Sequence, residues 1–180
     1  MKNIILGVTG SIAAYKACDI ANNLTKDGNS VKVIMTEGGQ KFVTPLSFMT
    51  LTKNRVYTNT FDNQDPGKVE HIALAGEADI FLVAPASADF IAKAWAGIAD
   101  DMLTSTLLAY RDKPVVICPA MNTNMYENPV TQRNIEDLKK RGFKFIEPKE
   151  AYLACGTVGK GALASVDDIV NEIREMIKRI

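Results

Sequence analysis

The stretch NIILGVTGS, residues 3–11, combines a short apolar run with a glycine-rich turn. The run covers residues 3–8, ends at Gly7 and Gly10, and predicts a buried strand over residues 3–8. Ser11 stands in the position of a helix N-cap. The helix that follows is predicted by an apolar stripe at Ile12, Tyr15, Ile20 and Leu24. The chain therefore opens with a strand, a tight turn and a helix.

The same alternation of strand and helix continues along the chain. Further strands are predicted at residues 30–35, 78–84, 114–118 and 143–146. Helices are predicted at residues 45–51, 89–96, 102–110, 131–141 and 166–180, and residues 54–70 are polar and rich in turn residues. No internal repeat, low-complexity tract or linker divides the chain. We therefore expect one α/β domain over residues 1–180, with a doubly wound parallel sheet in a Rossmann-like or flavodoxin-like three-layer sandwich.

The composition excludes several classes of protein. Among 180 residues, 21 Lys and Arg balance 21 Asp and Glu, so no clustered positive charge predicts a nucleic-acid partner. No apolar run approaches the roughly 20 residues of a membrane span, which argues against a membrane partner. The three cysteines never form a C-x-x-C pair and no export signal precedes the first strand, a combination that favours a reducing cytoplasm. With a single His, a metal site is not expected.

Candidate ligand groups follow the strands, because the carboxyl ends of a doubly wound sheet form a binding edge. Gly10-Ser11-Ile12 opens a helix after the first strand, so backbone N–H groups and a hydroxyl can hold a phosphate without a cation. Thr36 and Ser87 end other strands and add two hydroxyls to the same edge. Each of these residues is also an ordinary helix cap, but three converging hydroxyls favour a monophosphate such as that of FMN. The turn is neither G-x-G-x-x-G nor a P-loop, which disfavours dinucleotides and nucleoside triphosphates.

Three further segments carry candidate reactive groups. His71 is the only imidazole of the chain, and its alternative role is that of a surface or helix-capping residue. Asn122 follows a strand within PAMNTNMY, residues 119–126, where an amide can hold a carboxylate by neutral hydrogen bonds; ordinary Asx turns are the alternative. Cys155 lies among three glycines in residues 153–161. We interpret that segment as a lid that presents a thiol as nucleophile or acid, rather than as a plain flexible loop.

Five segments together carry a resemblance to a known family. They are GSIAAYK at 10–16, His71, PASAD at 85–89, PAMNTNM at 119–125 and ACG at 154–156. Over essentially the whole chain, the sequence resembles the homo-oligomeric flavin-containing cysteine decarboxylases, and within them the bacterial phosphopantothenoylcysteine decarboxylases. It departs from the plant and animal members at Asp89, where their pattern has Asn. Bacterial members are often fused to a C-terminal phosphopantothenoylcysteine synthetase, so the resemblance implies a monofunctional enzyme or one domain of a bifunctional one.

The resemblance implies a reaction, a cofactor and an assembly. FMN would oxidise the thiol of the small-molecule substrate 4′-phosphopantothenoylcysteine to a thioaldehyde, and CO₂ would then leave. The resulting enethiolate would be reduced to 4′-phosphopantetheine, a step of coenzyme A biosynthesis. The protein would be a cytoplasmic carboxy-lyase and a homo-oligomer, namely a trimer that is often assembled into a dodecamer.

The resemblance also implies residue roles. Asn122 would hold the substrate carboxylate, His71 would act as base or positioning group, and Cys155 would protonate the enethiolate. The phosphate and ribityl chain of FMN would contact Gly10, Ser11, Ile12, Thr36, Ser87, Ala88 and Asp89. Ala120 and Met121 would lie near the flavin ring, and the substrate would contact Asn122, Met125, Ala154 and Cys155.

Three functions known from related proteins are the alternatives, two of them enzymatic and one regulatory. A peptidyl-cysteine decarboxylase would use the same flavin, His and Asn. A flavin prenyltransferase shares the fold but not the set of His71, Asn122 and Cys155, which disfavours it. The third is a non-catalytic flavin-binding regulatory subunit of protein phosphatases, although such relatives can lack the Asn or Cys that this chain retains.

Overall fold

The computed structural model describes residues 1–62, 67–152, 156 and 158–180. Its centre is a six-stranded parallel sheet in the order β3-β2-β1-β4-β5-β6. The strands are β1 (Asn3–Val8), β2 (Ser30–Met35), β3 (Val56–Tyr57), β4 (Ile80–Ala86), β5 (Val115–Pro119) and β6 (Lys144–Phe145). The chain adds β2 and β3 on one side of β1, then returns to add β4, β5 and β6 on the other. This order confirms the predicted doubly wound parallel sheet.

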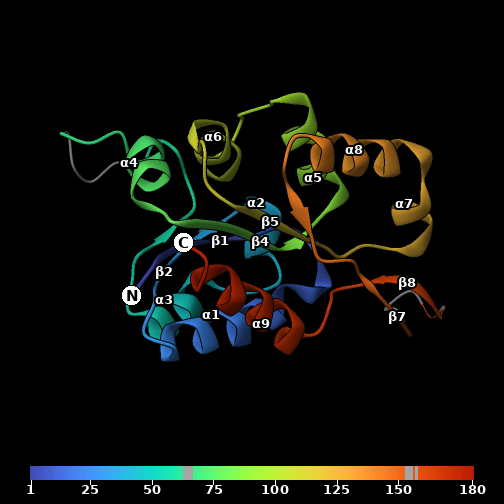
Figure 1. The fold of residues 1–180 in the computed structure, drawn as a ribbon, viewed down its shortest axis with the longest axis horizontal. Coiled ribbons are helices and arrows are strands. Elements are labelled where there is room, and N and C mark those ends of the chain that lie inside the picture. The colour runs from blue at the N-terminus through green and yellow to red at the C-terminus, as the bar shows by residue number, and fades with distance from the viewer. Residues whose placement is uncertain (63–66, 153–155, 157) are drawn as a thin grey trace.

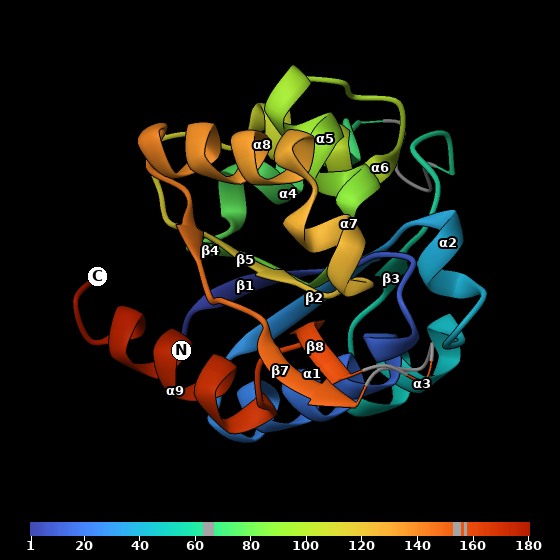
Figure 2. The same cartoon turned by 90° about the vertical axis from the view of Figure 1, so that its right-hand side faces the viewer.

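Helices cover both faces of the sheet, as Figures 1 and 2 show. One layer contains α1 (Lys16–Lys26), α3 (Pro45–Thr52) and α9 (Val166–Ile177). The other contains α4 (Glu70–Glu77), α5 (Ala88–Ala96), α6 (Met102–Ala109) and α8 (Pro129–Lys140). In β1, the side chains of Ile4 and Leu6 pack with the first layer and that of Ile5 with the second, because successive residues of a strand point to opposite faces. No helix within the described ranges is both long and apolar enough to cross a bilayer.

Short elements gather at the carboxyl edge of the sheet. The 3₁₀ helix η1 (Ile12–Tyr15) follows β1, α2 (Glu37–Gln40) follows β2, and α7 (Thr123–Glu127) follows β5. A separate antiparallel hairpin of β7 (Lys149–Tyr152) and β8 (Val158–Ala162) lies below α7 in Figures 1 and 2. These elements surround the candidate site described below.

The structure corrects three parts of the predicted element pattern. Residues 54–70, expected to be irregular, include β3, and α4 begins at Glu70. β8 occupies the second half of the segment expected to form a lid, because Gly159 and Gly161 let this strand lie directly against residues 121–123. β4 runs to Ala86 rather than ending at Ala84, since its side chains stay buried along the whole strand.

Candidate active site

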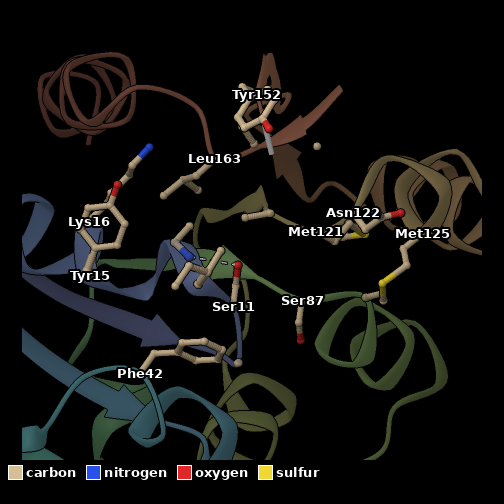
Figure 3. Close-up of a pocket in the computed structure, with 17 residues that line it drawn as sticks. Ser11, Tyr15, Lys16, Phe42, Ser87, Met121, Asn122, Met125, Tyr152 and Leu163 are labelled. Atoms are coloured by element: carbon tan, nitrogen blue, oxygen red, sulfur yellow. Dashed lines mark hydrogen bonds between the residues drawn. The ribbon is translucent and has the colours of Figure 1, made fainter. Parts of the chain in front are cut away.

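A cavity of about 510 Å³ opens at the carboxyl edge of the sheet (Figure 3). It lies where the strand order reverses between β1 and β4, the expected ligand position in a doubly wound sheet. Its volume is in the range of sites that hold small molecules and cofactors. The lining residues are Gly10, Ser11, Ile12, Ala13, Tyr15, Lys16, Phe42, Ser87, Ala88, Ala120, Met121, Asn122, Met125, Tyr152, Gly161, Ala162 and Leu163.

Thr9 joins the two turns on either side of the strand-order reversal. Its hydroxyl donates to the carbonyl of Pro85 at 2.8 Å and accepts from the backbone N–H of Ser87 at 2.8 Å. The Thr9 side chain is buried, so these bonds are shielded from water. The end of β1 and the end of β4 are therefore fixed to each other, and with them the residues that begin η1 and α5.

Two serines present hydroxyls to the cavity from helix N-termini. Ser11 caps η1 by accepting from the backbone N–H of Ala13 at 3.3 Å, and Ser87 caps α5 by accepting from Phe90 at 3.2 Å. Both residues line the cavity, and Figure 3 shows their side chains next to each other. Because each hydroxyl accepts in its cap, its hydrogen can still be donated to an anion. Capping and ligand binding are thus compatible at both positions.

The turn after β5 is held from two sides. The backbone N–H of Ala120 donates to the carbonyl of Ala86 at 3.0 Å, and that of Met121 donates to the carbonyl of Gly161 in β8 at 2.9 Å. Asn122 follows and caps α7 by accepting from the backbone N–H of Asn124 at 2.9 Å. The Asx turn at Asn122, which was the alternative interpretation of this segment, is therefore present. The same residue also lines the cavity, as Figure 3 shows.

The cavity is nearly free of formal charge. Among the described lining residues, Lys16 is the one charged side chain, and no carboxylate takes part. The walls are apolar where Ile12, Phe42, Met121 and Leu163 contribute. Such a surface suits a flat ring system, while the two serine caps suit a phosphate.

At this edge of the sheet, the backbones of Gly10 and Gly38 lie close together. A Cβ atom added to Gly10 would lie 3.2 Å from the Cα of Gly38, which is closer than ordinary van der Waals contact, so a side chain at residue 10 would push the turns after β1 and β2 slightly apart. Gly10 is also one of the lining residues, which leaves its backbone open to a ligand.

A family model described as Flavoprotein matches residues 1–178 of the chain. The chain belongs to this flavoprotein family. A probable phosphopantothenoylcysteine decarboxylase of Streptococcus mutans serotype c is 51% identical over 177 residues, which are 98% of this chain and 99% of the relative. The coenzyme A biosynthesis bifunctional protein CoaBC of Bacillus subtilis is 52% identical over 169 residues, which are 94% of this chain and 41% of that protein. This flavoprotein thus spans nearly all of the first relative and less than half of the second.

Solved structures share the fold of this flavoprotein. A PPC decarboxylase mutant complexed with pantothenoylaminoethenethiol matches it with a TM-score of 0.89 at 30% identity, over 98% of both chains. The FMN binding protein AtHal3 matches with a TM-score of 0.86 at 31% identity, over 99% of this chain and 98% of that one. The family resemblance expected from the sequence is confirmed, and so is the Rossmann-like fold class.

The cavity of this flavoprotein brings together most of the residues predicted to bind cofactor or substrate. Those that line it are Gly10, Ser11, Ile12, Ser87, Ala88, Ala120, Met121, Asn122 and Met125. Thr36 does not line it, because β2 is separated from β4 by β1; the Thr36 hydroxyl accepts from the backbone N–H of Gly39 at 3.1 Å and caps α2. Asp89 is also outside, with its carboxylate 3.4 Å from the ammonium of Lys93. Two of the three predicted hydroxyls therefore meet, and the contacts of Thr36 and Asp89 with FMN stay predictions.

The other predicted site residues lie elsewhere. His71 is the second residue of α4, partly exposed, and is not among the residues that line the cavity of its own chain. Ala154 and Cys155 lie outside the described residues, so their predicted roles stay predictions.

Several lining residues of this flavoprotein were not predicted from the sequence, among them Lys16, Phe42, Tyr152 and Leu163. Tyr15 was assigned only to the apolar stripe of a helix, and Ile12 both to that stripe and to the FMN contacts; each is 57% exposed and lines the cavity. The reason is η1, since a 3₁₀ helix has three residues per turn and moves side chains off the α-helical stripe. The glycine and serine before this segment were the signal that the first turn serves a ligand.

The two cysteines that the structure describes are poor reactive groups. Burial raises the pKa of the Cys118 thiol, which lies inside β5. Burial and the nearby Asp19 carboxylate raise the pKa of the Cys18 thiol on α1. Because the thiolate is the nucleophilic form, neither residue is suited to nucleophilic chemistry at neutral pH.

Proposed function

We propose that this flavoprotein decarboxylates 4′-phosphopantothenoylcysteine to 4′-phosphopantetheine with FMN as cofactor. The observation that carries the proposal is the cavity at the strand-order reversal, which joins two serine caps, an apolar wall and the Asn122 amide. A relative that is 51% identical over nearly the full length of both chains carries the name of this activity, which supports the substrate. We also propose that the protein works in a reducing cytoplasm, as the pattern of its cysteines indicates.

The described residues fit FMN. Ser11 and Ser87, each at a helix N-terminus, suit the phosphate, and the backbone around Gly10 is close enough to the cavity to contact it. Ala120 and Met121 supply an apolar surface for the flavin ring. When bound, FMN supplies the two-electron exchange that a substrate thiol needs to become an electron acceptor for decarboxylation and then to be restored.

The chain's own residues bind, orient and move protons. Asn122 holds the cysteinyl carboxylate by its amide, and Met125 packs beside the substrate on the same wall. Cys155 donates the proton that the enethiolate needs on reduction. This role is taken from the family resemblance, and the two cysteines that the structure describes, Cys18 and Cys118, do not line the cavity.

The proposal places His71 of one copy at the cavity of another. His71 lies on α4, outside the cavity of its own chain, so a role at the reacting atoms needs a second subunit. Apolar side chains near both places are about half exposed: Phe42 and Met125 at the cavity, and Val69 and Ile72 beside His71. Their burial against each other would favour association. The assembly is a homo-oligomer, and the trimer or dodecamer implied by the family resemblance is its expected form.

Turnover by the purified protein tests the function. The protein is examined for a flavin absorbance spectrum and then mixed with 4′-phosphopantothenoylcysteine or with a peptide that ends in cysteine. We expect a flavin spectrum, release of CO₂ and the mass of 4′-phosphopantetheine. Release of CO₂ from the peptide alone would move the activity to peptidyl-cysteine decarboxylation. A flavin spectrum without turnover of either compound would indicate a non-catalytic flavoprotein.

Mixed oligomers test the shared site. The variants His71→Asn and Asn122→Asp are each expected to be inactive when purified alone. If each site takes His71 and Asn122 from different copies, random co-assembly restores on the order of a quarter of the sites. If one chain supplied both residues, every site of the mixed oligomer would carry a defect and no activity would return.

A further inference from the structure

The first turn of α4 carries His71 but has no capping side chain. The helix has eight residues, and Val69 at its N-cap makes no side-chain hydrogen bond to the first turn. A polar N-cap stabilises a helix, and without one the first N–H groups of the helix need other support. A short helix that starts this way tends to fray where His71 lies, unless another contact holds it.

Glu70, the residue before His71, makes such a contact. One of its carboxylate oxygens accepts a hydrogen bond from the guanidinium Nη1 of Arg55. The Glu70 side chain is 11% exposed, and its other oxygen has no hydrogen-bond partner within the described part of the chain. A carboxylate this buried depends strongly on its cationic partner. Its place at the N-terminus of α4 is also favourable for a negative charge.

Arg55 is itself held in place by three contacts. Its Nη2 donates to the backbone carbonyl of Asp62 at 2.7 Å and lies 3.7 Å from the Asp62 carboxylate. Its guanidinium lies 5.0 Å from the ring centroid of Tyr57, within the range of a cation–π interaction. Arg55 directly precedes β3, which pairs with β2. The residue thus ties the start of α4 to the edge of the central sheet.

We propose that Arg55 is a positioning residue that sets the place of the His71 imidazole through Glu70. The ion pair lies one residue from His71, where the cap is missing, so its loss frees the first turn of α4. This inference rests on the proposed role of His71 in decarboxylation. It assigns Arg55 no contact with substrate or cofactor.

The single histidine of the chain makes the test direct. Protein labelled with ¹³C at the histidine Cε1 gives one His71 resonance, read at fixed pH in the flavin-loaded oligomer. In Arg55→Met, we expect this resonance to shift or broaden and kcat to fall about ten- to a hundredfold, with KM within about twofold. Arg55→Lys keeps the charge and should recover part of both effects. The matched control is Lys32→Met, which removes the 2.5 Å ion pair to Glu77 at the other end of α4 and should change neither.

A second variant covers the case in which Arg55→Met does not fold. The double variant Arg55→Met/Glu70→Gln removes both charges and leaves no buried carboxylate, yet it should still displace the His71 resonance and lower kcat. An unchanged resonance and kcat in a folded Arg55 variant would overturn the positioning role. Full activity of His71→Asn is a different outcome, since it would refute the proposed role of His71 while the resonance still decides whether Arg55 positions it.

Discussion

Gly161→Ala should separate β8 from the loop that carries Asn122. A Cβ atom at residue 161 would lie 2.2 Å from the carbonyl oxygen of Met121 and 3.3 Å from the backbone nitrogen of Thr123. Ordinary contacts of this kind lie at 3.4–4 Å, and the opposing atoms belong to the backbone, so no side-chain rotation can relieve the clash. The hairpin and the loop must part by roughly 1 Å.

The magnitude follows from the contacts that this movement breaks. The hydrogen bond from the Met121 N–H to the Gly161 carbonyl, 2.9 Å long, is worth about 1 kcal/mol net. Overpacking against rigid backbone adds about 1–3 kcal/mol, for a total of about 2–4 kcal/mol. For a domain of this size, that corresponds to a fall in Tm of roughly 4–16 °C. A displacement of about 1 Å at Asn122 is expected to lower kcat/KM about a hundredfold.

Thermal melting and turnover measured on the same preparation check this expectation. The matched control is Gly76→Ala in α4, where an added Cβ meets no heavy atom within 4 Å. That substitution should leave turnover unchanged and raise stability by up to about 1 kcal/mol, because Ala favours a helix over Gly. If Gly161→Ala kept the Tm and turnover of the parent protein, the tight contact between β8 and the Asn122 loop would be refuted.

Two further substitutions test Cys155 as the proton donor and the contribution of the Glu147 carboxylate to stability. Cys155→Ser should still release CO₂ but accumulate the unsaturated product, followed by mass spectrometry; complete conversion to 4′-phosphopantetheine would remove Cys155 from the proposed mechanism. Burial opposes ionisation of the Glu147 carboxyl, but hydrogen bonds from Lys139 and Tyr126 outweigh it and lower its pKa to about 2 from 4.5. Glu147→Gln should therefore cost about 1–2 kcal/mol at neutral pH, after allowance for the 44% exposure of the side chain. This difference should be fully present above pH 4.5 and vanish as the pH falls to about 2, as urea unfolding of both proteins can show; a difference that persists at pH 2 would contradict it.

The strands could be predicted where burial on both faces leaves a continuous apolar run. β1 and β2 have the predicted boundaries, because their side chains enter the two cores on either side of the sheet. β3 has only two residues and pairs on one side, so its own sequence carries little periodicity. β8 has the sequence VGKGA, in which no alternation predicts a strand; it pairs antiparallel with β7 and packs against residues 121–123. Local pattern does not contain that information.

The candidate site shows the same division between local and tertiary information. Ser11, Thr36 and Ser87 all follow strands and all cap helices, so their sequence contexts are alike. The strand order decides between them, since β1 and β4 are neighbours at the reversal and β2 is not next to β4. His71 lies on α4 and does not line the cavity of its own chain, so its proposed role depends on a second subunit, which no pattern in the sequence indicates. Residue type and position after a strand therefore indicate the candidate groups, and the order of the strands decides which of them meet.

The distribution of charge in the cavity fits a decarboxylation. Loss of CO₂ removes the negative charge from the substrate carboxylate, so a cation beside that group would stabilise the starting state more than the transition state. A buried ion pair would make this penalty larger, since charges interact more strongly away from water. Asn122 lines the cavity with a neutral amide. Lys16, the one charged side chain among the described lining residues, lies on the opposite side of the cavity from Asn122 (Figure 3). An arginine at residue 122 would bind the carboxylate more tightly and for that reason slow its departure.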